Sequence, residues 1–283
     1  MMDSQSHKHI LRNLSFFTIL VIALGWFGRW LDSLMGNMPS QGIGQLIWII
    51  APLGVSFLLR AFAGDGWKDL GIRPAVKGNI LWYAVSVLVY PICIALILAI
   101  GFALNAVSFS DSPSSKVSIL AQAFALAIVP MFFKNIFEEF GYRGYLAPKL
   151  HKLGLNAFVT YVIVGLIWGV WHLPYLAVFM SYTTESLATY IPHFLVGTVA
   201  TSIVYGEIRI LTNSVWPAVL MHTVGNVFLN TLFLKDYVKL ASGMEYLVAP
   251  AVEGILSIVL FTLIGVGIYV LRKKRTMAPE SSC

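Results

Sequence analysis

Eight long apolar stretches divide the chain and limit what it can fold into. They cover approximately residues 13–33, 43–62, 79–104, 120–140, 157–178, 190–208, 214–233 and 247–271. Each is close to the length of about 20 residues with which an α-helix crosses the apolar part of a bilayer. Unbroken apolar runs favour helices over a membrane β-barrel, whose strands alternate apolar and polar residues. We therefore predict an all-α fold, a polytopic membrane helix bundle of about eight transmembrane helices, as a single integral membrane domain over residues 1–283.

The composition supports a membrane protein and gives no sign of nucleic-acid binding. Only 11% of the residues are charged and 58% are hydrophobic, whereas soluble domains average about 25% charged residues. The net charge of +6 has a simpler explanation, because four basic residues at 272–275 directly follow the last apolar run. The two cysteines, Cys93 and Cys283, support neither a disulfide framework nor a metal cluster.

The distribution of basic residues predicts the orientation of the bundle. Lys and Arg gather in every second connection, at positions 8, 12, 60, 68, 73, 77, 143, 149, 152, 209 and 272–275. The alternate connections hold fewer, at positions 29, 116, 235 and 239. Since cytoplasmic loops carry the excess of Lys and Arg, we predict that both termini are cytoplasmic. The first apolar run is expected to be a retained span, because no small-residue cleavage site follows it.

Ionisable residues lie inside the predicted spans, where burial of charge is costly and usually functional. Glu138 and Glu139 end the fourth span, and Arg143 follows four residues after Glu139. Residues four apart share a helix face, so Glu139 and Arg143 are expected to pair, whereas Glu138 faces about 100° away. A solvated ion pair at a helix end would explain the same pattern.

Two histidines are expected to reach the depth of Glu138. A turn is predicted at 153–156, with Gly154 ending one helix and Asn156 beginning the next. Glu138 and His172 lie about equally far from that turn, roughly 25 Å along antiparallel helices. His222, near the start of the seventh span, lies roughly 13 Å deep by the same rise per residue. A lone histidine is more often a core residue, but one glutamate and two histidines at one level indicate a functional site.

Such a cluster can activate water in two ways. A carboxylate in a low-dielectric site is a usable general base, while histidine holds a water or stabilises an oxyanion. Alternatively, Glu138, His172 and His222 form a ligand set suited to catalytic zinc, with one position left for water. Asn226 lies one turn after His222 and offers a neutral donor on the same face. Both alternatives predict hydrolysis of a substrate that reaches the membrane.

Three short motifs resemble those of a known family. The sequences EEFGYR at 138–143, WGVWH at 168–172 and HTVGN at 222–226 match the patterns EExxxR, [F/W]xxxH and HxxxN, in the same order. The chain is thus similar to the CPBP family of intramembrane proteases, also called Abi, which includes the type II CAAX prenyl endopeptidases. The resemblance covers a catalytic core of about 120–230.

The resemblance implies a role for each matching residue. Glu138 and His172 would activate the catalytic water, and His222 and Asn226 would stabilise the oxyanion. Glu139 and Arg143 would support the site, and Trp168 would contribute packing. The nearby polar residues Asn135, Tyr142 and His193 are expected either to pack or to hold the site residues in place. Zinc is a possible cofactor, and the partners would be the lipid bilayer and a peptide or protein substrate. A bacterial plasma membrane is the expected location.

Two other functions fit the same sequence. A non-catalytic membrane scaffold, or a bacteriocin self-immunity protein of the same fold, would keep the motifs for stability. A small transporter could use the carboxylates and histidines as a proton relay. Transporters often contain paired halves with broken helices. This sequence does not show such halves, so the transporter function ranks last.

Overall fold

The computed structural model describes residues 4–38, 42–109, 117–180, 182–233 and 237–277, and these ranges confirm an all-α fold. The helices are α1 Ser4–Leu34, α2 Ile43–Phe62, α3 Ile80–Ala103, α4 Val117–Gly141, α5 Ala147–Lys152, α6 Ala157–His172, α7 Leu176–Phe179, α8 Leu187–Thr212, α9 Trp216–Leu232, α10 Glu245–Val248 and α11 Ile255–Met277. A π-helical turn, Tyr142–Leu146, joins α4 to α5, and a 3₁₀ turn, Leu173–Tyr175, joins α6 to α7. Two short antiparallel strands, β1 Val107–Phe109 and β2 Val238–Leu240, pair Val107 with Leu240.

Seven helical segments of the described chain are long and apolar enough to cross a bilayer. The predicted seventh span is α9, a helix of only 17 residues. At 1.5 Å per residue it is about 25 Å long, less than the roughly 30 Å of a bilayer's apolar core. Seven of the eight predicted spans thus correspond to these segments, and the remaining one, α9, is a shorter helix packed between α3 and α4.

Hydropathy placed two helix ends incorrectly. The predicted last span began at residue 247, but α11 begins at Ile255, and residues 249–254 form a non-helical connection after the short helix α10. Pro250 lies in this connection, and a proline disfavours helix both at its own position and at the one before it. The predicted fourth span ended at 140, whereas the helical path continues through the π-helical turn to Lys152.

The turn between α5 and α6 is confirmed. Gly154 has a φ of +81°, a left-handed conformation that glycine adopts without steric cost. Asn156 is the N-cap of α6, and its side-chain oxygen accepts a hydrogen bond from the Val159 amide at 2.9 Å. These two residues make α4–α5 and α6 neighbouring antiparallel elements, which is what brings their polar residues together.

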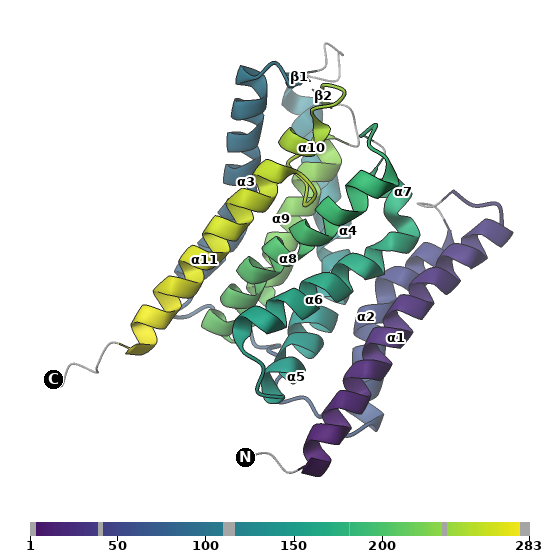
Figure 1. The fold of residues 1–283 in the computed structure, drawn as a ribbon, viewed down its shortest axis with the longest axis vertical. Helices are drawn as coiled ribbons and strands as arrows, with labels where there is room; N and C mark the ends of the chain where they lie inside the picture. Colours follow the sequence, from purple (N-terminus) through teal and green to yellow (C-terminus); the bar gives the residue numbers. More distant parts are fainter. Residues whose placement is uncertain (1–3, 39–41, 110–116, 181, 234–236, 278–283) are drawn as a thin grey trace.

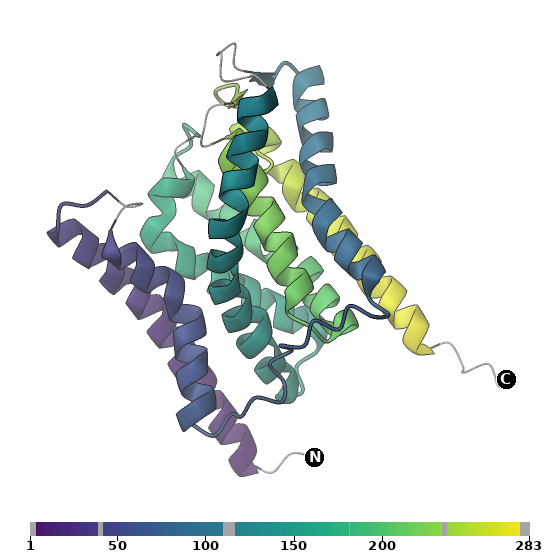
Figure 2. The same ribbon diagram turned by 180° about the vertical axis from the view of Figure 1, so that it is seen from behind.

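Helix α8 lies near the middle of the bundle and packs against α6, α9 and α11. Figures 1 and 2 show α1 and α2 along one side, α3 and α11 along the other, and α4, α6, α8 and α9 between them. The start of α1 and the end of α11 point toward the same end of the bundle (Figure 1). This is the arrangement that both termini on one side of a membrane require.

The outer faces of the helices are apolar. Large side chains such as Phe16, Ile19, Leu126 and Leu263 are exposed. A soluble protein would bury such faces, whereas lipid chains solvate them. The chain is thus an integral membrane protein.

Candidate active site

The described structure brings Glu138 of α4, His172 of α6 and His222 of α9 to one point. Nε2 of His172 and Nε2 of His222 each lie 4.0 Å from Oε2 of Glu138. Glu138 is completely buried, and both histidines are 6% exposed. The predicted convergence of three helices is confirmed, while the catalytic roles of these residues stay predictions.

Hydrogen bonds fix the orientation of both imidazole rings. Nδ1 of His172 lies 2.8 Å from the Trp168 carbonyl oxygen, so Nδ1 donates and carries a proton. Nδ1 of His222 lies 2.9 Å from Oε1 of Glu139 and donates in the same way. In their neutral forms the two rings therefore present the lone pairs of their Nε2 atoms toward Glu138.

Trp168 does more than the packing that the resemblance implied. It belongs to the apolar core between α1, α2 and α6. Its indole Nε1 also donates a hydrogen bond of 3.1 Å to Oε2 of Glu138. A tryptophan at the aromatic position of the [F/W]xxxH pattern, here Trp168, thus orients the carboxylate of Glu138.

Lys134 is a member of the site that the sequence analysis missed. Its Nζ donates to Oε1 of Glu138 and forms an ion pair with it, one helical turn earlier on α4. The sequence did contain a signal for Lys134, because a lysine inside a predicted membrane span is itself a functional candidate. Lys134 holds one oxygen of the carboxylate and leaves the other, Oε2, facing the histidines.

Glu139 and Arg143 form the predicted pair, with Nη1 of Arg143 3.1 Å from Oε1 of Glu139. Both side chains are at least 99% buried. Nη2 of Arg143 donates to Ser202 Oγ at 3.1 Å. The guanidinium also lies over two aromatic rings, 4.7 Å from the centroid of Trp168 and 4.5 Å from that of Tyr205. With Lys134 and Glu138, the site contains two cations and two anions in contact, which offsets much of the cost of burial.

Arg143 lies inside the π-helical turn Tyr142–Leu146, where the Ala147 amide donates to the Tyr142 carbonyl. A π-helical turn has more residues per turn than an α-helix, so it rotates α5 relative to α4. Such turns are frequent at functional sites. No feature of the sequence predicted this turn.

Asn226 lies beside the three residues and is oriented by its own partner. Its Nδ2 donates to Oδ1 of Asn135 at 2.9 Å, and Asn135 contacts Thr223 Oγ1 at 3.4 Å. Asn135 therefore supports Asn226, as expected of a nearby polar residue. Tyr142 packs against Trp171 within the core.

His193 of α8 has a different neighbour, since its Nδ1 lies 3.9 Å from Oε2 of Glu185.

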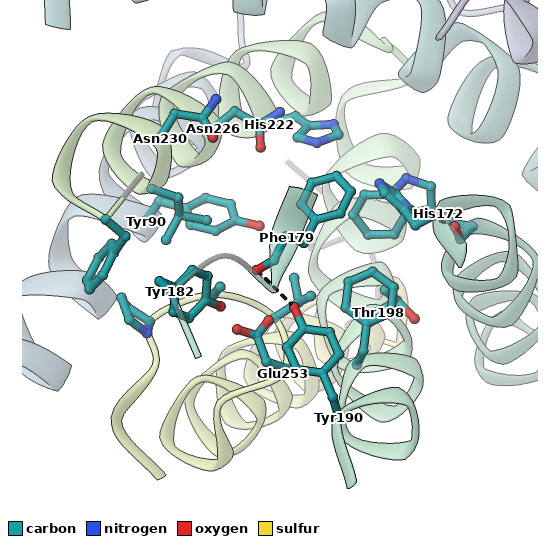
Figure 3. Close-up of a pocket in the computed structure, with 17 residues that line it drawn as sticks. Tyr90, His172, Phe179, Tyr182, Tyr190, Thr198, His222, Asn226, Asn230 and Glu253 are labelled. Atoms are coloured by element: carbon teal, nitrogen blue, oxygen red, sulfur yellow. Dashed lines mark hydrogen bonds between the residues drawn. The ribbon is translucent and has the colours of Figure 1, made fainter. Parts of the chain in front are cut away.

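The site opens into a cavity of about 80 Å³. Figure 3 shows His222 and Asn226 along one side of this cavity and His172 at one end. Aromatic side chains, including Tyr90, Phe179 and Phe194, form much of the wall. A second cavity of about 370 Å³ lies between α2, α4, α7 and α9 and includes Lys134. The two cavities share Phe179, Asn226 and Asn230, so they are neighbours.

The fit of a zinc ion can be judged from the candidate ligands. Oxygen and nitrogen ligands at 2.0–2.2 Å from tetrahedral zinc are about 3.4 Å apart. Here both histidine nitrogens are 4.0 Å from Glu138 Oε2, and Lys134 already binds the same carboxylate. Among the residues that the structure describes, no group of three or more His, Cys, Asp or Glu is arranged to hold a metal ion. As placed, the residues do not fit zinc, and zinc binding stays a prediction.

Comparison with known protein families supports the motif assignment. A family model described as "Type II CAAX prenyl endopeptidase Rce1-like" matches residues 119–228. The matched segment contains Glu138, His172, His222 and Asn226. A search of curated proteins finds no match.

Proposed function

We propose that this chain, whose residues 119–228 match the family model of Rce1-like type II CAAX prenyl endopeptidases, is an intramembrane endopeptidase. It hydrolyses peptide bonds of membrane-associated proteins or peptides with a water activated by Glu138 and His172. The observation that carries this proposal is the approach of two histidine Nε2 atoms to within 4.0 Å of one oxygen of a buried glutamate. Packing alone gives no reason for three helices to direct these groups at one point.

The first step needs two hydrogen-bond acceptors around one water. Oε2 of Glu138 and the lone pair of His172 Nε2 are both acceptors and lie 4.0 Å apart. A water with hydrogen bonds of about 2.8 Å bridges acceptors separated by roughly 4–4.5 Å. One water thus donates one hydrogen to each residue and directs an oxygen lone pair away from both. When that oxygen attacks the scissile carbonyl carbon, Glu138 takes the proton.

The attack moves the carbonyl electrons onto oxygen, and His222 supports the resulting oxyanion. This role requires the imidazolium form of His222, which keeps its Nδ1–H bond to Glu139 and donates Nε2–H to the oxyanion. The Glu139 carboxylate balances the charge of the imidazolium. Asn226 Nδ2 has a second hydrogen beyond the one given to Asn135 and adds another neutral donor. Collapse of the intermediate breaks the C–N bond, and Glu138 returns its proton to the leaving amine.

We propose that the substrate reaches the site through the second cavity. It lies between α2, α4, α7 and α9 and shares Asn226 with the site cavity. We place the protein in a bacterial plasma membrane with both termini cytoplasmic, the orientation that its basic loops favour.

The proposal is tested by comparing membrane peptides from cells that carry the wild-type protein or Glu138→Gln. Glutamine keeps the shape of the side chain but cannot accept a proton from water. We expect peptides that accumulate uncleaved in the variant, and a loss of about 10²–10⁴-fold in cleavage by the purified protein. His172→Ala should give the same result.

Three outcomes decide between the functions. Wild-type cleavage by Glu138→Gln would overturn the mechanism. A cellular effect that survives Glu138→Gln, without any cleaved peptide, would favour the scaffold or self-immunity function. Metal analysis of the purified protein, and cleavage after chelation, decide whether zinc takes part.

A further inference from the structure

Glu253 is a buried carboxyl group that the proposed reaction does not use. It lies in the connection between α10 and α11, and only 2% of the residue is exposed. Its Oε1 has no hydrogen-bond partner among the described residues. Buried carboxyl groups are normally paired, because an unpaired one loses its hydration without compensation. A group of this kind inside a cavity indicates that its partner comes with a ligand.

Glu253 lines the same cavity as His172, His222 and Asn226. Figure 3 shows it across the cavity from His222 and Asn226, with Tyr182 and Tyr190 beside it. The cavity therefore connects the reaction site to Glu253. Its volume of about 80 Å³ holds several water molecules or one slender side chain.

A second unpaired polar atom lies at the same end of the cavity. The hydroxyl oxygen of Tyr182 is buried and has no partner in the described part of the chain. The neighbouring Tyr190 hydroxyl already donates to the Phe179 carbonyl at 3.5 Å. Glu253 and Tyr182 thus provide one carboxyl and one phenol oxygen for a ligand that donates more than one hydrogen bond.

The walls between the two ends favour an alkyl chain with a cationic tip. They include the rings of Phe179, Tyr190 and Phe233, which pack against methylene groups and attract a cation over their faces. No described lysine, arginine or histidine forms an ion pair with Glu253. Burial raises the pKa of the Glu253 carboxyl to about 8, as expected where the compensating cation is absent.

We propose that Glu253 and Tyr182 form the polar end of a substrate subsite for a side chain that ends in an ammonium or guanidinium group, that is, lysine or arginine. The proposal rests on the proposed endopeptidase function. The ammonium group donates to the Glu253 carboxylate and to the Tyr182 hydroxyl oxygen. The alkyl part of the side chain lies along the aromatic wall, and the adjoining peptide bond reaches Glu138 and His172. Glu253 is thereby a specificity-determining residue.

Binding of a small cation tests the subsite without requiring cleavage. The probe is n-butylammonium, and 1-butanol is a neutral probe with the same number of heavy atoms. Both are titrated into the purified full-length protein, with affinity measured by ligand-observed NMR. We expect Glu253→Gln to weaken n-butylammonium binding by roughly tenfold to hundredfold, and 1-butanol binding by less than about twofold. Tyr182→Phe should weaken n-butylammonium binding by a smaller factor.

Glu185→Gln is the matched control. It removes another carboxylate from the segment before α8, but Glu185 does not line the cavity and lies beside His193. This variant should bind both probes like the wild type. Equal binding of n-butylammonium to wild type and Glu253→Gln would overturn the subsite, as would a preference for 1-butanol.

Cleavage assays extend the test to the substrate. Peptides of a cleaved sequence are compared in pairs with lysine or norleucine at each position around the scissile bond. At the peptide position whose side chain occupies the subsite, the wild-type protein should favour lysine over norleucine. Glu253→Gln should lower the lysine-to-norleucine ratio of kcat/KM at that position by roughly tenfold. Glu253-dependent cation binding without any cleavage would refute the endopeptidase and keep the subsite. Cleavage with no lysine or arginine preference would refute the subsite and keep the endopeptidase.

Discussion

Nδ1 of His222 lies 2.9 Å from Oε1 of Glu139, so the second glutamate of the EExxxR motif holds a histidine that the first glutamate faces. The two glutamates are adjacent in sequence but interact with opposite sides of one imidazole ring. This arrangement fixes α9 to α4 at the candidate active site. It also gives Glu139 two partners, since Arg143 contacts the same oxygen at 3.1 Å.

The first prediction concerns Glu139. Glu139→Gln removes the carboxylate that both Arg143 and His222 contact and leaves the arginine as an unpaired buried charge. We expect a loss of about 3–5 kcal/mol in the free energy of unfolding, measured in mixed micelles. Cleavage should fall by roughly 100-fold, because the His222 imidazolium loses its counter-ion.

Ser202→Ala is the control for this prediction. It removes the other hydrogen bond of Arg143, at 3.1 Å, and leaves Glu139 in place. We expect this variant to be slightly less stable and to cleave within about twofold of wild type. If both variants lose stability but neither loses activity, Glu139 has only a structural role.

The second prediction concerns Lys134, the cation beside Glu138. Lys134→Met keeps the length of the side chain but removes the ion pair that holds Oε1 of Glu138. The carboxylate then keeps only the hydrogen bond from Trp168 to orient it, and we expect cleavage to fall by roughly 10–100-fold. Lys134→Arg keeps the charge and should retain most of the activity. Equal rates for the methionine and arginine variants would exclude a role for the charge.

The third prediction separates the hydrogen bond of Trp168 from its packing. Trp168→Phe keeps an aromatic ring but removes the 3.1 Å hydrogen bond to Glu138, which is expected to contribute about 1–3 kcal/mol. Cleavage should therefore fall by roughly tenfold or more. Trp171→Phe is the matched control, because the Trp171 Nε1 has no partner in the described structure. Similar losses of activity in the two variants would show that packing alone is responsible.

The fourth prediction follows from the buried carboxyl of Glu253, whose pKa burial raises from 4.5 to about 8. The folded protein binds this proton more tightly than the unfolded chain, so the contribution is complete below about pH 4.5 and is lost as pH rises through 8. The free energy of unfolding should fall between pH 5 and pH 8 by at most about 1.4 kcal/mol per pH unit. Glu253→Gln should remove this slope. An unchanged slope would mean that another group titrates.

The sequence predicted the main features of the site because simple geometry places them. Gly154 and Asn156 define a turn, and equal distances from it bring Glu138 and His172 to the same depth. These arguments need only the rise of a helix and the chemistry of its ends. The pair of Glu139 and Arg143 follows from spacing along one helix in the same way.

Other features depend on packing between elements that are distant in sequence. The bond from Trp168 to Glu138 and that from His222 to Glu139 require the side-chain orientations of three helices. The connection at 249–254 is apolar because it packs inside the protein, so hydropathy alone reads it as part of a span. The sequence analysis did not select Glu253, because hydropathy assigned the residues around it to a span. Lys134 was visible in the sequence but lies outside the three motifs.

The cavity is built from two parts of the chain. The segment matched by the family model, residues 119–228, supplies the groups proposed to break the bond. Tyr90 and the connection that carries Glu253 lie outside that segment and close the other side of the cavity. Exchange of residues 244–254 between related proteins should therefore redirect which peptide is cut while cutting itself persists. Under the proposed function, the groups that would break the bond and the group that would select the substrate thus come from different parts of the chain.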